Sequence, residues 1–141
     1  MHFSANDVYN SFIKEKEQPG FDLAVSETNY RFNPENSGPI RLSNENEPRV
    51  DLISLQDGSW FTLEHNESFK LVSADTFVLP ARFRPRVSTY EKAMRYGLSV
   101  TASEPPVQDS EGHIVVTVQN ITRSTIIIAV NDPIARISFD S

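Results

Sequence analysis

The sequence contains no cysteine, and this absence excludes a disulfide-stapled scaffold, a thiolate zinc site and a cysteine nucleophile. It also lacks any apolar run near the roughly 20 residues that a membrane-spanning helix needs. The first ten residues, MHFSANDVYN, have neither a basic region nor an apolar stretch, so a secretory signal is not expected. These absences predict a protein of the cytoplasm with no membrane partner.

Positive charge is scarce as well. The chain has 13 Lys and Arg against 19 Asp and Glu, a net charge of −6, so broad electrostatic binding of nucleic acid is not expected. His2, His65 and His113 are too far apart for metal-ligand spacing, and no phosphate-cradling glycine loop is present. We therefore expect no metal site and no cofactor, with Mg²⁺ entering only together with a polyphosphate ligand.

The 141 residues suit a single domain, residues 1–141, with a mainly β fold. Ser4 and Asp7 form a capping-box pattern that predicts a helix over Ser4–Glu17. A second capping box, Ser88 to Glu91, predicts one internal helix over 88–96, which ends before Gly97. Between and after these helices, short apolar segments separated by turn residues predict a barrel or sandwich. The expected strands are 21–25, 50–55, 60–63, 69–72, 76–79, 98–102, 113–118, 125–130 and 134–139, with a weak strand near 40–42.

The segment 125–130 is apolar and mostly β-branched, with Ile126, Ile127 and Ile128 in sequence. Such a run is typical of a strand that is covered on both faces. A small β domain with two short helices has few elements that could cover the second face of this strand. We therefore expect another subunit to cover this strand.

Arg82, Arg84 and Arg86 alternate in a segment that two prolines keep extended. Alternate residues of an extended segment share one face, and guanidinium groups match phosphate oxygens. The segment leads into the predicted helix start, where Ser88, Thr89 and free N–H groups would favour an anion. The pattern predicts a phosphate-binding site. The alternative is that these arginines pair with the surplus carboxylates at a subunit contact.

Five short motifs also occur in a familiar order. They are a Gly-x-Asp-Leu strand at 20–23, a turn and strand at 55–63 followed by Glu67, an arginine-serine segment at 81–89 with a helix and Gly97-Leu98 after it, a strand at 112–120, and a closing strand at 134–137. Together they resemble the dUTPase and dCTP-deaminase superfamily over nearly the whole chain, and the deaminase branch more closely.

This resemblance implies a distorted β-barrel, the β-clip, assembled as a homotrimer with ligand clefts between subunits. It implies a phosphate site at the family's Arg-Ser-Ser motif, which here reads Arg86-Val87-Ser88. It also places Gln119 and Asn120, at the end of the strand after Gly112, where the edge of a base could be recognised.

The sequence departs from the family at the catalytic positions. The hydrolases activate water with an Asp, and counting back from Gly112 that position is Val107. The deaminases use a Glu within the following strand, and that position is Thr117, whose hydroxyl is too weak an acid or base to replace a carboxylate. If the alignment contains a gap, Asp109 or Glu111 could stand in for the lost Asp.

Three further departures lie outside those positions. The aromatic residue that stacks on the sugar falls on Ser110, the last motif has Arg136 in place of its Gln, and the glycine-rich closing tail of the hydrolases has no counterpart. These differences predict a degenerate member of the family.

Three function classes follow from these observations. The first is a catalytically inactive protein that binds a phosphorylated nucleotide or a nucleotide-derived ligand at the trimer clefts. The second is an active dUTP- or dCTP-processing enzyme with a relocated carboxylate. The third is a trimeric interaction module that keeps only the fold. A phage could encode such a compact member to sequester a nucleotide or to engage a host protein, which by analogy adds a host protein to the expected partners.

Overall fold

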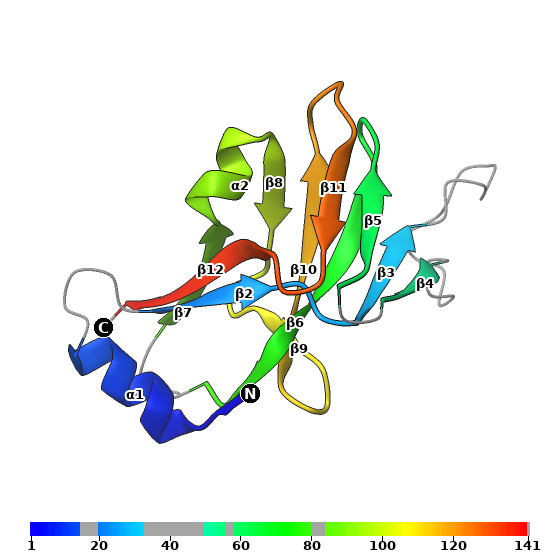
Figure 1. Ribbon diagram of the computed structural model, residues 1–141. Helices are drawn as coiled ribbons and strands as arrows, with labels where there is room; N and C mark the ends of the chain where they lie inside the picture. The colour runs from blue at the N-terminus through cyan, green and yellow to red at the C-terminus, as the bar shows by residue number, and fades with distance from the viewer. Residues whose placement is uncertain (15–19, 33–49, 56–57, 80–83, 141) are drawn as a thin grey trace, which may run out of the picture.

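The computed structural model describes residues 1–14, 20–32, 50–55, 58–79 and 84–140 (Figure 1). In this part of the chain two short helices accompany twelve strands, so the prediction of a mainly β fold with an N-terminal and an internal helix is confirmed. The helices are α1 (Ala5–Lys14) and α2 (Glu91–Arg95). The strands are β1 (His2–Phe3), β2 (Gly20–Ala24), β3 (Thr28–Phe32), β4 (Val50–Ser54), β5 (Trp60–Leu63), β6 (Ser68–Phe77), β7 (Arg84–Thr89), β8 (Leu98–Thr101), β9 (Val107–Gln108), β10 (His113–Asn120), β11 (Ile126–Ala129) and β12 (Pro133–Asp140).

The start of α1 follows directly from the sequence. The N–H of Ser4 donates to Asp7 Oδ2 at 3.0 Å, and the N–H of Asp7 donates to Ser4 Oγ at 3.2 Å, which is the reciprocal pattern of a capping box. Val8 on the first turn is fully buried. The predicted helix start is therefore confirmed, whereas the predicted end at Glu17 lies outside the described residues.

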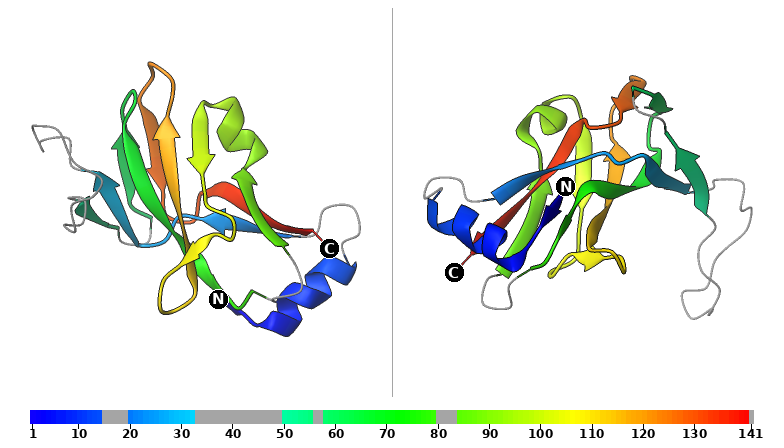
Figure 2. Two further views of the ribbon diagram at one scale, coloured as in Figure 1. Left: turned by 180° about the vertical axis from the view of Figure 1, so that it is seen from behind. Right: turned by 60° about the horizontal axis from the view of Figure 1, so that its bottom comes forward.

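The strands form three sheets. The largest has the order β4-β3-β6-β10-β8, with β1 paired to β6 and β9 paired to β10. A three-stranded sheet has the order β2-β12-β7, and β5 pairs with β11. In Figures 1 and 2, β2 and β12 run across the direction of β10 and β5, and α1 lies at one end of the three-stranded sheet. This crossing lets the sheets enclose a common interior.

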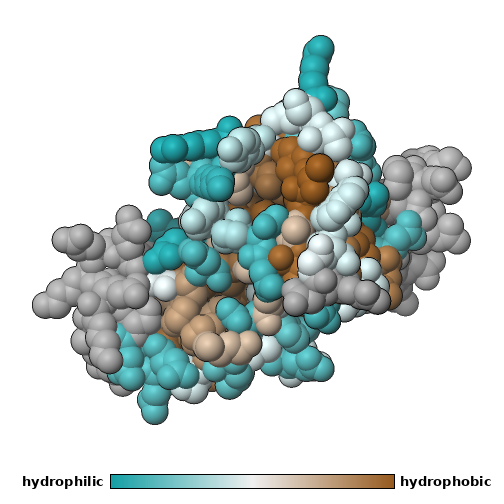
Figure 3. Space-filling model, viewed as in Figure 1, coloured by the Kyte–Doolittle hydropathy of each residue, from teal (hydrophilic) through white to brown (hydrophobic). Residues whose placement is uncertain are grey.

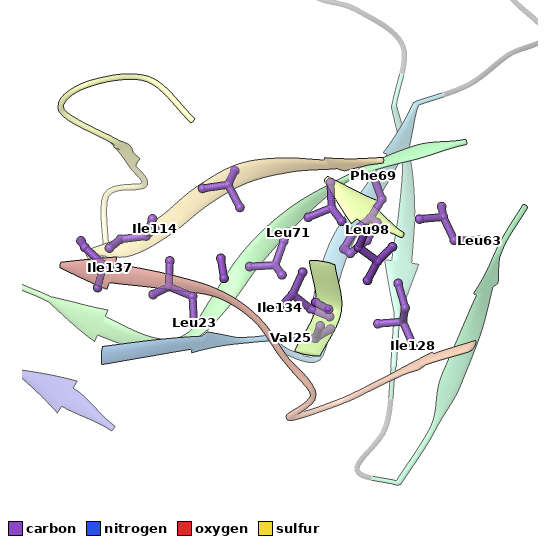
Figure 4. Packing of buried hydrophobic residues seen from close by; sticks show 14 of the residues in the cluster. Leu23, Val25, Leu63, Phe69, Leu71, Leu98, Ile114, Ile128, Ile134 and Ile137 are labelled. Carbon is purple, nitrogen blue, oxygen red and sulfur yellow. The ribbon is translucent and has the colours of Figure 1, made fainter. Parts of the chain in front are cut away.

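All three sheets contribute side chains to one hydrophobic core (Figure 4). Leu71 on β6, Leu23 on β2 and Ile128 on β11 are each nearly or fully buried. Full burial of such a side chain contributes about 1.5–3 kcal/mol relative to exposure. The core therefore fixes the relative position of the sheets, and with it the position of the surface residues that they carry. No helix in the described ranges is long and apolar enough to span a membrane.

The large sheet differs from the prediction in β6 and β3, and its two-residue strands β1 and β9 were not expected. Segments 69–72 and 76–79, expected as two strands, belong largely to the ten-residue β6. Ser73 allows this because its hydroxyl accepts from the N–H of Ile114 at 2.9 Å and donates to the carbonyl of Asp75 at 2.6 Å. β3 was expected as loop because it is polar, yet its buried Asn29 accepts from the N–H of Val72 at 3.0 Å. The weak strand expected near 40–42 lies outside the described residues.

The internal helix is shorter than predicted. Ser88 and Thr89 belong to β7, and α2 begins at Glu91 with Tyr90 as its N-cap and no side-chain capping bond. The predicted Ser88 capping box is therefore wrong, because pairing with β12 holds Ser88 in an extended strand. The predicted glycine after the helix is confirmed, since Gly97 has φ +93° and a Cβ there would lie 1.9 Å from Thr122 Cγ2.

Candidate functional site

One face of β7 carries the alternating arginines. Burial along the strand alternates strictly, so Arg84, Arg86 and Ser88 are exposed and the residues between them are partly buried. The predicted common face is confirmed for Arg84 and Arg86, and Ser88 lies on it too. Arg82, the first arginine of the pattern, lies outside the described residues.

β12 adds a further arginine to this face. In the antiparallel register Arg136 lies opposite Ser88 on one side and opposite Asp22 of β2 on the other. Directly opposed residues of antiparallel strands share a face. The guanidinium of Arg136 donates to Asp22 Oδ1 at 2.9 Å, and both side chains are partly exposed. We call the exposed surface of Arg84, Arg86, Ser88 and Arg136 the arginine face.

A polar hollow of about 840 Å³ opens beside the arginine face. Ser88, Arg136 and Asp22 border it from the sheet, and Lys92 and Arg95 border it from α2. Within α2, Arg95 pairs with Glu91 at 2.7 Å, and both side chains are about three-quarters exposed. Such surface pairs contribute little and exchange partners readily. The hollow is therefore bordered by three cationic side chains, and by the carboxylates of Asp22 and Glu91 that pair with two of them.

Thr89 and the start of α2 contribute less than the sequence suggested. Thr89 borders the hollow, but alternation turns its side chain to the opposite face, where Oγ1 accepts from the N–H of Val100 at 3.1 Å. Because α2 has only five residues and begins after β7, Ser88 and Thr89 are not part of a helix start. The expected anion site at a helix N-terminus is therefore replaced by a site on a sheet face.

Gln119 and Asn120 lie in β10, which belongs to the large sheet and not to the sheet of the arginine face. Gln119 is half-buried, with its amide nitrogen 3.5 Å from the carbonyl of Asn66. The side chain of Asn120 is fully buried and makes four hydrogen bonds within the fold, to Leu63, Ser124 and twice to Thr122. Since these bonds use both amide protons and the amide oxygen, Asn120 has a structural role and is left out of the site.

The two candidate replacement carboxylates lie in the turn between β9 and β10. This turn borders a cavity of about 1140 Å³, formed with β3 and β6. Asp109 Oδ1 accepts from the N–H groups of Glu111 at 3.0 Å and His113 at 2.9 Å, and Oδ2 lies 2.8 Å from His113 Nδ1. Glu111 is exposed, with Oε2 3.7 Å from His113 Nδ1.

These contacts change the acidity of Asp109. Partial burial alone would raise the pKa of its carboxyl, but the hydrogen bonds from the N–H and side chain of His113, with the N–H of Glu111, outweigh burial and lower the pKa. A carboxylate with a lowered pKa is a weaker base than an unperturbed one. The turn therefore holds Asp109 as a structural acceptor.

Val107 and Thr117, the two positions at which the resemblance implies a carboxylate, are on neighbouring strands. Val107 in β9 is 57% exposed and lies opposite Val115. Thr117 in β10 lies between Lys70 of β6 and Thr101 of β8. No group of three or more metal-ligating side chains occurs among the described residues.

Sequence reasoning did not find Arg136 as a site residue. In the sequence, Arg136 stood out only because it replaces the Gln of the closing motif. The alternation of Ile134 to Phe139 placed Arg136 on an outward face, but only the pairing of β12 with β7 shows that this is the face of Arg84 and Arg86. Lys92 and Arg95 were missed for the same reason, since both reach the site through tertiary packing.

The sequence and the structure of this chain were both compared with those of known proteins. The sequence profile of the dCTP deaminase-like family matches residues 5–141. A search of curated protein sequences gave no significant match. Among solved structures, the chain is similar to the 2′-deoxycytidine 5′-triphosphate deaminase of Agrobacterium tumefaciens, with a TM-score of 0.59 and 14% sequence identity over 86% of this chain. The matched region is 38% of that deaminase chain, so this chain spans well under half of its length.

The two comparisons agree with the structure. The structural match shows the same fold, and the profile match covers almost all of the sequence. The predicted resemblance to the superfamily is thereby confirmed, together with the mainly β, dCTP deaminase-like fold. The chain belongs to the dCTP deaminase-like family.

Proposed function

We propose that this protein binds a phosphorylated, nucleotide-type anion on the arginine face and does not turn it over. The observation that supports this proposal best is the placement of Arg84, Arg86 and Arg136 on one exposed sheet face. These arginines gather on one face although the chain has a net charge of −6. Membership of a nucleotide-processing family supplies the class of ligand.

The chemistry of the face fits a phosphate group. A planar guanidinium offers two parallel N–H groups, which match two phosphate oxygens. Arg136 already engages a carboxylate, that of Asp22, and a phosphate presents the same kind of acceptor with more charge. Because both members of that pair are partly exposed, exchanging Asp22 for a phosphate costs little. Ser88 lies opposite Arg136 and can donate its hydroxyl to the same ligand.

The proposed absence of turnover is supported by the β9–β10 region. Val107 and Thr117 provide no carboxylate, and Asp109 is engaged by three hydrogen-bond donors. Loss of a general base typically lowers the rate about 10²–10⁴-fold. Glu111 is the remaining candidate for a relocated base, because it borders the cavity formed with β3 and β6 and is exposed. An active enzyme would therefore have to depend on Glu111.

A specific observation also supports self-association. Ile128 is buried in the core, whereas Ile127 on the opposite face of β11 is 61% exposed. On the same outer face, Trp60 of β5 is 59% exposed. Among the described residues, one of the two faces that the sequence predicted to be covered is thus buried, and Ile127 on the other is exposed. We expect a second copy to cover the other, in a homotrimer whose clefts include the arginine face.

The binding proposal is tested by a thermal-shift screen with nucleoside mono-, di- and triphosphates and cyclic nucleotides, followed by calorimetric titration of the best ligand. A ligand at 100 times its Kd stabilises the fold by about 2.7 kcal/mol. Hydrogen bonds to charged groups contribute about 1.5–3 kcal/mol each, so Arg86→Ala and Arg136→Ala should each weaken binding about tenfold or more.

Arg123→Ala is the matched control, because Arg123 is an exposed arginine in the segment between β10 and β11 and not on the arginine face. It should bind with wild-type affinity. If no nucleotide binds, or if the arginine-face variants bind as tightly as Arg123→Ala, the proposal is wrong and the interaction-module function becomes the better one.

A further inference from the structure

The polar hollow beside the arginine face carries charges of both signs. Its cationic side chains are Arg136, Lys92 and Arg95, and its carboxylates are those of Asp22 and Glu91. Together these five side chains give the border of the hollow a net charge of +1 at neutral pH. Figure 3 shows hydrophilic side chains gathered over α2 and towards β12. A small positive charge of this kind matches a ligand with one negative charge better than a ligand with several.

Both carboxylates are held at the hollow by contacts within the fold. Asp22 Oδ1 accepts from the guanidinium of Arg136 at 2.9 Å, and Glu91 Oε1 accepts from that of Arg95 at 2.7 Å. The strand register also fixes Asp22, because it lies directly opposite Arg136 in the pair of β2 and β12. An anion that takes Arg136 from Asp22 exchanges one acceptor for another at little cost, but the carboxylate stays beside the anion.

The repulsion from that carboxylate depends on the charge of the ligand. Coulomb repulsion grows with the product of the two charges and is strongest at low ionic strength. A phosphodiester carries a single negative charge, a phosphomonoester carries about two, and a triphosphate carries more than either. Arg84 and Arg86 do not border the hollow, so a ligand would have to extend along β7 to use their positive charge.

We propose that the polar hollow selects a phosphodiester, and that Asp22 is a specificity-determining residue that discriminates against triphosphates. This inference rests on the proposed function and adds which class of phosphate the site takes. The planar guanidinium of Arg136 matches the two unesterified oxygens of a phosphodiester. Ser88 lies opposite Arg136 and can donate its hydroxyl to the same group.

The test compares three ligands that share one base and differ in charge. Calorimetric titrations at low ionic strength use the 3′,5′-cyclic monophosphate, the 5′-monophosphate and the 5′-triphosphate of the nucleoside selected in the thermal-shift screen. With EDTA present, the wild type should bind the cyclic nucleotide, a phosphodiester, about fivefold or more tightly than the triphosphate, with the monophosphate between them. Mg²⁺ neutralises part of the triphosphate charge, so it should strengthen triphosphate binding and leave binding of the cyclic nucleotide unchanged.

Asp22→Asn removes the carboxylate charge and keeps an oxygen that can accept from Arg136. It should strengthen triphosphate binding about fivefold and cyclic-nucleotide binding about twofold, so that the preference narrows. Glu91→Gln should act in the same direction. Because the side chains of Asp22 and Glu91 are 45% and 73% exposed, both variants should keep the fold, and this is checked by the unfolding midpoint.

Glu27→Gln is the matched control, because it removes one exposed carboxylate at a different place. Glu27 borders the cavity formed with β3 and β6 and does not border the hollow. Its variant should keep the wild-type preference among the three ligands. An equal change of preference in Glu27→Gln and Asp22→Asn would show that only the net charge of the chain matters and would overturn the inference.

The remaining outcomes separate this inference from the proposed function. If the wild type with EDTA binds the triphosphate more tightly than the cyclic nucleotide, or if Asp22→Asn keeps the wild-type preference, the inference is wrong and the anion site stands. A triphosphate preference that Arg86→Ala removes would show that the ligand extends along β7, and it would overturn the inference as well. If none of the three ligands binds, or if Arg136→Ala binds all of them as the wild type does, the proposed function fails and this inference fails with it.

Discussion

Replacing Asn120 by Ala tests the structural role that the fold gives to this side chain. The amide nitrogen donates to the carbonyls of Leu63 and Ser124, each at 2.8 Å. The amide oxygen accepts from the N–H and the hydroxyl of Thr122, each at 2.8 Å. Asn120 therefore ties the end of β10 to β5 and to the segment that leads into β11.

The cost of the change can be worked out from the burial of each partner. Leu63 is fully buried, so its carbonyl cannot regain a partner from water, and an unsatisfied buried group costs about 1–3 kcal/mol. Ser124 is exposed and Thr122 is partly exposed, so water replaces most of what they lose. We expect Asn120→Ala to lower the free energy of unfolding by about 2–4 kcal/mol in total. In a chain of this size the midpoint of thermal unfolding should fall by roughly 8–15 °C.

The assay is urea denaturation followed by Trp60 fluorescence, with thermal unfolding as a second measurement. Asn120→Asp should be at least as damaging, because it replaces two donors by acceptors that face carbonyl oxygens. Gln119→Ala is the matched control, since the neighbouring amide has only a 3.5 Å contact and should change stability by less than about 0.5 kcal/mol. An Asn120→Ala protein with wild-type stability and reduced nucleotide affinity would refute the structural role and return Asn120 to the ligand site.

Three more results are expected. Ile127→Glu should leave the unfolding free energy of the single chain nearly unchanged, because Ile127 is 61% exposed there. The same change should convert a trimer to monomers, as measured by light scattering. A wild-type protein that is monomeric at micromolar concentration would contradict the trimer. The wild type should release neither pyrophosphate from dUTP nor ammonia from dCTP, with or without Mg²⁺, and turnover that Glu111→Gln abolishes would show that the base has moved. Because the folded-state pKa of Asp109 is lowered, its carboxylate stabilises the fold above its unfolded pKa and loses that contribution as pH falls through the folded value. The stability difference between wild type and Asp109→Asn should therefore shrink below about pH 4, as measured by urea denaturation.

Local sequence signals predicted the elements whose stabilising contacts are themselves local. The Ser4–Asp7 capping box set the start of α1, and Gly97 marked the end of α2. The alternation of Arg84 and Arg86 predicted a shared exposed face, which needs only an extended backbone. In each case the residues that decide the structure lie within a few positions of one another.

The remaining features depend on contacts between distant segments. Ser88 has the spacing of a helix cap, but its pairing with Arg136 across β7 and β12 keeps it in a strand. Asn29 looks like a loop residue, but Val72 supplies the partner that lets it lie buried in β3. The position of Arg136 beside Ser88 likewise depends on the register between β7 and β12, which no local sequence pattern indicates. Sequence reasoning therefore found the alternation of arginines in β7 and predicted a strand at 134–139, but missed the pairing of the two.

The placement of these elements explains how binding and catalysis could separate in one family member. The arginine face is built by β7 and β12, which pair with each other and with β2. The positions that lack carboxylates, Val107 and Thr117, lie on β9 and β10 in a different sheet. The turn between these strands is held by Asp109 through bonds that do not involve Val107. A change of residue at Val107 or Thr117 therefore breaks no contact within the sheet that carries the arginine face, so the proposed binding does not depend on a carboxylate at either position.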